Sequence, residues 1–92
     1  MHAALLPLTD HAMRRSQQRG KMRGSLHLVY QFGDLERRAG PARFALRLSH
    51  SECEGLLSRG ASLRDVERAA RVELIVAERD GAIITVLHAK AR

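Results

Sequence analysis

One short stretch near the start of the chain carries residue types that proton transfer and phosphate binding require. His11, Arg15 and Arg19 recur every four residues. At about 100° per residue, a helix would spread them over only about 80° of its circumference. Thr9 is a typical helix cap before them, and Gly20 suits the left-handed residue that follows a helix end. The stretch therefore predicts a short helix with one cationic edge.

Metal-independent cleavage of a phosphodiester needs a proton acceptor, a proton donor and cations that stabilise the charge developing on the phosphate oxygens. His11 is the best titratable candidate, because the dipole at a helix start favours the neutral, basic imidazole. Arg15 and Arg19 are placed to hold the phosphate. Thr85 or His88, on the last predicted strand, would complete the site if the helix packs near that strand.

The same residues also fit roles without catalysis. The cationic edge has the pattern of an ordinary solvated helix face, with His11 hydrogen-bonded to backbone. Arg15 and Arg19 are structural residues if they pair with acids of this half of the chain. Those acids are Asp10, Asp34 and Glu36. A further alternative is a basic module that binds RNA, DNA or an acidic protein. An enzyme needs an open cleft around His11, whereas a binding module does not.

The charge distribution indicates a polyanionic partner. The formal net charge is +6, and all of it lies in residues 1–48, where nine Lys and Arg stand against three acids. Fourteen of the sixteen cations are Arg, which suits bidentate phosphate binding, although a GC-rich genome produces the same bias. We therefore expect salt-sensitive binding of RNA or another polyanion. The expected contact residues are Arg14, Arg23, Arg37 and Arg43.

Neither a metal nor another cofactor is indicated. The five His residues lack the paired spacing of a zinc site, and no glycine-rich phosphate loop is present. Cys53 is the single cysteine and falls among apolar helix positions, so we expect it in the core of a cytoplasmic protein. The apolar start is short and interrupted by Pro7, which predicts neither a signal peptide nor a membrane span.

The chain reads as a single domain over residues 1–92. Residues 25–33 fit both a strand and a helix, and we assign a helix with Ser25 as its cap. Residues 43–48 alternate apolar and polar side chains and predict a half-buried strand, with 34–38 as its hairpin partner.

Two short helices are predicted next, because Ser49 and Ser62 each stand as caps before apolar stripes, and Ser49 opens a capping box with Glu52. The chain then ends in two β-branched runs joined by an Asp-Gly turn. A two-residue turn places Thr85 opposite Val76. The expected fold class is α+β, with two N-terminal helices packed on an antiparallel sheet of about four strands and short helices inserted before the C-terminal hairpin.

The first helix and the last strand together resemble the small family described as domain of unknown function 4258. The residues that carry the resemblance are His11, Arg15, Arg19, Gly20, Thr85 and His88. Members of that family resemble RelE-like toxins and the wider group of barnase, colicin and EndoU nucleases. The resemblance runs from Leu8 to about Lys90, with two departures, at residues 21–24 and at Ala89. It implies a toxin-like endoribonuclease and leaves room for an acidic, antitoxin-like protein partner.

Overall fold

The computed structural model describes residues 6–18 and 23–89. Within these residues it has four helices and one four-stranded sheet. The elements are α1 (Asp10–Gln18), α2 (Arg23–Phe32), β1 (Leu35–Arg38), β2 (Arg43–Arg47), α3 (His50–Ser58), α4 (Leu63–Ala69), β3 (Val72–Ala77) and β4 (Ile83–His88). All neighbouring strands are antiparallel and lie in chain order. The predicted α+β class is confirmed.

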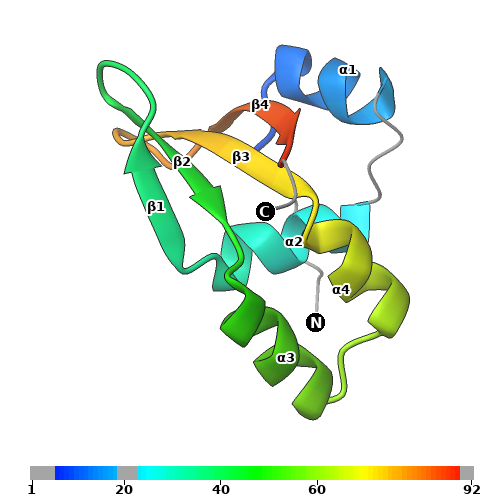
Figure 1. Cartoon of the computed structure of the whole chain (residues 1–92). Helices are drawn as coiled ribbons and strands as arrows, with labels where there is room; N and C mark the ends of the chain where they lie inside the picture. Colours follow the sequence, from blue (N-terminus) through cyan, green and yellow to red (C-terminus); the bar gives the residue numbers. More distant parts are fainter. Residues whose placement is uncertain (1–5, 19–22, 90–92) are drawn as a thin grey trace.

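The helices are divided between the two sides of the sheet (Figure 1). α2, α3 and α4 lie on one side, and α2 packs against β3, β2 and α4. The core fills the space between this helix layer and the sheet, and it includes Leu26 and Val29 of α2 with Leu74 and Val86 of the sheet. α1 lies on the other side, along β4. None of the described helices combines the length and apolar character that crossing a bilayer requires.

The strand register defines the sheet surface that points away from the core. Arg37, Ala45, Ile75 and Thr85 are successive partners across the four strands. Because directly opposite residues point to the same side of an antiparallel sheet, and neighbours along a strand alternate, this row identifies a whole face. We call it the outer face. Its residues are Leu35, Arg37, Arg43, Ala45, Arg47, Glu73, Ile75, Ala77, Thr85 and Leu87.

Three of the four predicted helix caps are confirmed. Thr9 Oγ1 accepts from the backbone N–H of Ala12 at 3.1 Å. Ser49 Oγ accepts from Glu52 N at 3.0 Å, and Ser62 caps α4 in the same way with a longer bond of 3.4 Å. Each hydroxyl satisfies a donor that has no partner inside its own helix.

The predicted helix over 25–33 is confirmed, but its predicted cap is wrong. α2 begins at Arg23, so Ser25 lies inside the first turn, where it has no exposed surface. Arg23 and Gly24 belong to the helix. The helical choice is explained by packing, since Leu26 and Val29 bury one stripe against the core. Arg19, Gly20, Lys21 and Met22 lie outside the described residues.

The C-terminal hairpin forms as predicted, but its register is shifted by one residue. Thr85 faces Ile75 and not Val76. The strands are separated by a loop longer than two residues. In this loop Gly81 has a φ of +74°, and its N–H donates to Ala77 O. A bulge also lies next to Ile75 in the paired strands. A shift of one residue exchanges the two faces of a strand, so Thr85 lies on the outer face.

Candidate nucleic-acid interface

α1 is attached to the sheet through the residue before its first turn. Thr9 N donates to Ile83 O at 3.0 Å, and Thr9 Oγ1 donates to Ile84 O, also at 3.0 Å. Ala12, one turn further on, is fully buried, and Ser16 follows on the same stripe. The helix therefore has one side fixed against β4, and this fixes which of its residues remain accessible.

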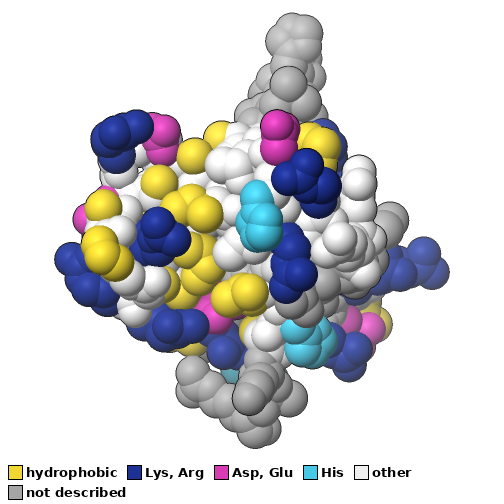
Figure 2. Space-filling model, turned by 90° about the horizontal axis from the view of Figure 1, so that it is seen from above, with side chains coloured by type: hydrophobic (Ala, Val, Ile, Leu, Met, Phe, Trp, Pro, Cys, Tyr) yellow, Lys and Arg dark blue, Asp and Glu magenta, His cyan; other side chains and the backbone are white. Residues whose placement is uncertain are grey.

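Two residues of the predicted catalytic site, His11 and Arg15, lie on α1. His11 is exposed and Arg15 is half-buried one turn later on the same edge. In the part of the chain that the structure describes, neither side chain has an ion-pair partner, so the alternative in which Arg15 pairs with a nearby acid is not observed. Figure 2 shows this side of the molecule, with a His side chain lying between Lys or Arg side chains at the edge of a hydrophobic area.

The two residues predicted on the last strand are separated by the register. Thr85 is on the outer face, the side on which α1 lies. His88 is opposite Val72, a core residue, and therefore belongs to the other face of the sheet. The structure thus places Thr85 on the same side as His11 and Arg15, and it places His88 in a different hollow, at the end of the sheet.

The four Arg residues predicted to bind nucleic acid differ in their surroundings. Arg14 is exposed on α1. Arg43 is exposed on the outer face, and no carboxylate of the described chain pairs with it. Arg37 is also on this face, but Glu73 accepts from its Nη2 at 2.9 Å and from its Nε at 3.3 Å. Arg23 begins α2 on the opposite side of the sheet, away from the other three.

Arg47 is an outer-face cation beyond the four predicted contact residues. It is half-buried and faces Leu35 of β1. The apolar–polar alternation that identified Arg43 also applies to Arg47, four residues later, so a detectable signal was present. Hydrophobic side chains gather within this surface and dark blue Lys and Arg side chains lie around them (Figure 2). The result is an apolar centre, formed partly by Ala45 and Ile75, with a cationic margin.

The imidazole of His11 is the candidate for proton transfer on this surface. Cys53 is buried in the core, as predicted, and its burial raises the pKa of its thiol, with smaller contributions from the charges of Asp34 and Glu52. No group of three His, Cys, Asp or Glu residues within 6–18 and 23–89 is placed to share a metal ion. The surface can therefore hold phosphates through guanidiniums and accept a proton through one imidazole.

No family model, curated protein or solved structure matches this chain. The resemblance to the domain of unknown function 4258 family stays a prediction. The cationic surface formed by α1 and the outer face is therefore the feature of the molecule that bears on function.

Proposed function

We propose that this domain binds RNA through α1 and the outer face of its sheet. One observation carries the proposal: Arg14 and Arg15 of α1 and Arg43 of β2 belong to one side of the molecule, and none of them has a carboxylate partner among the described residues. Unpaired surface guanidiniums attract the phosphate backbone, which supplies most of the affinity in sequence-independent binding.

The dimensions and composition of the surface fit a nucleic-acid strand. With about 4.8 Å between neighbouring strands, the row from Thr85 to Arg37 spans roughly 14 Å, and α1 extends it beyond β4. The outer face has no aromatic side chain on which a base could stack. We therefore expect contacts to phosphate and sugar to dominate, with little dependence on base sequence.

Binding is tested by a salt titration with fluorescently labelled single-stranded RNA. The double variant Arg14→Glu/Arg43→Glu should lose at least about tenfold in affinity and flatten the slope of log affinity against log salt by about 1.4, the value for two lost phosphate contacts. The matched control is Arg64→Glu/Arg68→Glu, which makes the same charge change on α4, across the sheet. An equal loss in both variants, or no binding at low ionic strength, would remove the proposal.

A second candidate function is metal-independent cleavage of the bound RNA. It is favoured by the position of His11 and Arg15 on one edge of α1, with the hydroxyl-bearing Thr85 on the same side of the sheet. In this reaction His11 takes the proton of a ribose 2′-hydroxyl as that oxygen attacks the adjacent phosphorus. The bond from phosphorus to the 5′-oxygen breaks, and water protonates the leaving oxygen. Arg15 stabilises the charge on the phosphate oxygens.

Cleavage is tested with a chelator present. Loss of a positioned base typically lowers the reaction rate by about 10² to 10⁴, so His11→Ala should cleave RNA more slowly than the wild-type chain by this factor. Its Tm should not change, because the His11 side chain is exposed. Gln17→Ala, exposed on the same helix, should cleave normally. If the wild-type chain cleaves no RNA, or if His11→Ala cleaves as fast, the catalytic role fails and RNA binding is tested on its own.

A further inference from the structure

The two edges of the sheet are finished differently. At β4, Ile83 N donates to Pro7 O at 2.8 Å and Ile83 O accepts from Thr9 N at 3.0 Å, so residues 7–9 cover the start of that edge. β1 forms the other edge, and in the described chain it pairs with β2 alone (Figure 1). Its side chains are half-buried at Leu35 and exposed over 36–38. An edge strand without a neighbour offers a place for a further strand.

The backbone of β1 has hydrogen-bonding groups that point to this free edge. Ala39 N donates to Arg43 O at 3.2 Å, so the polar backbone groups of Ala39 point toward β2. Successive residues of an antiparallel strand turn these groups alternately to its two sides, and those of Glu36 and Arg38 therefore face the free edge. The same two residues of a second, antiparallel strand have the groups that pair with them.

The side chains of β1 are complementary to a second copy of the same strand. Glu36 and Arg38 lie on the helix side of the sheet, two residues apart and opposite in charge. When two copies pair antiparallel with Arg37 at the centre, each Glu36 is opposite Arg38 of the second copy, and each Leu35 is opposite Ala39. Unlike charges in opposite positions stabilise a strand pair. A shift of two residues puts Glu36 opposite Glu36, or Arg38 opposite Arg38, so like charges oppose the other registers.

The ion pairs that β1 already makes are compatible with this pairing. Arg37 reaches across β2 to Glu73 of β3, with 2.9 Å between Nη2 and Oε1, so the two Arg37 side chains of a dimer extend away from each other. Arg38 Nη1 lies 3.3 Å from Glu78 Oε2, a long contact between exposed groups. Glu36 has no ion-pair partner among the described residues. Glu36 of a second copy therefore gains a cation and brings Arg38 a second carboxylate.

We propose that two copies of this chain associate through their β1 strands, so that the four strands of each copy join in one antiparallel sheet. A two-fold axis normal to the sheet relates the copies, which makes the two contact patches identical and puts both outer faces on the same side. The joined edge of four residues is about 14 Å long, which is shorter than a permanent dimer needs. The association is therefore weak and reversible.

The association depends on β1 and does not require the RNA binding proposed above, but it changes the surface that RNA meets. With about 4.8 Å between neighbouring strands, the two joined outer faces span roughly 34 Å. Because α1 lies along β4, an α1 helix stands at each far end of this surface. An RNA strand long enough to contact both copies favours the dimer, and by linkage the dimer favours RNA to the same extent.

Self-association is tested without RNA by analytical ultracentrifugation from about 10 µM to about 1 mM, the range for weak contacts. The mean mass of the wild-type chain should rise with concentration toward that of a dimer. Glu36→Arg replaces attraction by repulsion at two positions and should weaken the association by at least about tenfold. Glu36→Arg/Arg38→Glu exchanges the two charges and should restore it. Glu67→Arg, the same charge change at an exposed position of α4, should associate normally.

A backbone variant tests the strand pairing itself. Arg38→Pro removes the N–H that faces the free edge and should abolish association, whereas the monomer should keep its fold because proline is tolerated on edge strands. Circular dichroism checks the fold of each variant. The inference is overturned if the wild-type chain stays monomeric at every concentration, if Glu36→Arg associates as well as Glu67→Arg, or if the charge exchange does not restore association.

RNA of two lengths separates this inference from the proposed function. Glu36→Arg should bind an RNA too short to reach both copies at least as tightly as the wild-type chain, because it adds a positive charge. On long RNA the wild-type chain should bind cooperatively and Glu36→Arg should not. A chain that dimerises but binds no RNA would remove the proposed function and keep the dimer. A chain that binds RNA of both lengths only as a monomer would remove the dimer and keep the function.

Discussion

The starts of α1 and α3 use the same device with different partners. In each, a hydroxyl accepts from an N–H three residues later and donates to a distant part of the chain. Thr9 donates to a backbone carbonyl, that of Ile84 in β4. Ser49 donates to the carboxylate of Asp34. α1 is thus attached to the sheet by neutral groups, whereas α3 is attached to the start of β1 by an ionised carboxylate.

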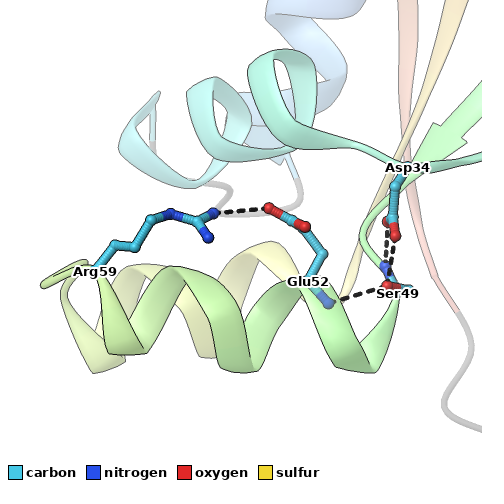
Figure 3. Close-up of polar contacts among 4 residues, drawn as sticks. All are labelled: Asp34, Ser49, Glu52 and Arg59. Carbon is cyan, nitrogen blue, oxygen red and sulfur yellow. Dashed lines mark hydrogen bonds and ion pairs between the residues drawn. The ribbon is translucent and has the colours of Figure 1, made fainter.

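The consequence is a different charge balance around the two helices. At α3, Glu52 pairs with Arg59, and Asp34 is bonded twice to Ser49 (Figure 3). At α1, Arg14 and Arg15 have no acidic partner in the described ranges 6–18 and 23–89. Charges that are used within the fold contribute to positioning, whereas charges left in solvent remain available to a ligand. This difference is why we assign the RNA surface to α1 and the outer face.

The largest stability effect in this comparison is expected at Thr9. Thr9→Val keeps the shape of the side chain but removes the cap of α1 and leaves Ile84 O without its donor, which should lower the free energy of unfolding by about 2 kcal/mol. It should also weaken RNA binding, because α1 loses one of its hydrogen bonds to β4. Urea denaturation and RNA titration measure the two effects, and Thr9→Ser, which keeps the hydroxyl, should restore both.

A smaller effect is expected at Ser49. Ser49→Ala removes the α3 cap and one of the two bonds to Asp34, so the free energy of unfolding should fall by about 1 kcal/mol. Ser51→Ala, exposed in the same helix, is the control for lost hydroxyls in general. Affinity for RNA should not change. If it falls as much as in Thr9→Val, the two helix starts do not differ in the way we describe.

The smallest effect is expected at Asp34, and it should depend on pH. Hydrogen bonds from Ser49 lower the pKa of Asp34 below its ordinary 3.8, so this carboxylate stabilises the folded state above that pH. The contribution is lost as the pH falls through the lowered pKa. Asp34→Asn should therefore be slightly less stable than the wild-type chain at pH 7, by less than about 1 kcal/mol because the group is exposed, and the difference should close near pH 2. A gap that persists unchanged at pH 2 would show that the charge is not responsible.

Elements set by local chemistry were predictable from the sequence. The Ser49 and Ser62 caps depend on a side chain and an N–H three residues away, and the first hairpin depends on alternation over a few residues. The helix over 25–33 was predictable in type and not in its start, because Ser25 is a good cap by composition but is buried by tertiary packing.

The candidate site, too, has one part that was predictable from the sequence and one part that was not. The sequence by itself determined that His11 and Arg15 share one edge of a helix, since the helical repeat depends only on spacing. Only the tertiary structure decided that Thr85 joins their side of the sheet and that His88 does not, because a longer loop and a bulge shift the register of β3 and β4. Side chains alternate with a period of two along a strand, so one residue of register exchanges its faces, and that register depends on loop geometry and packing.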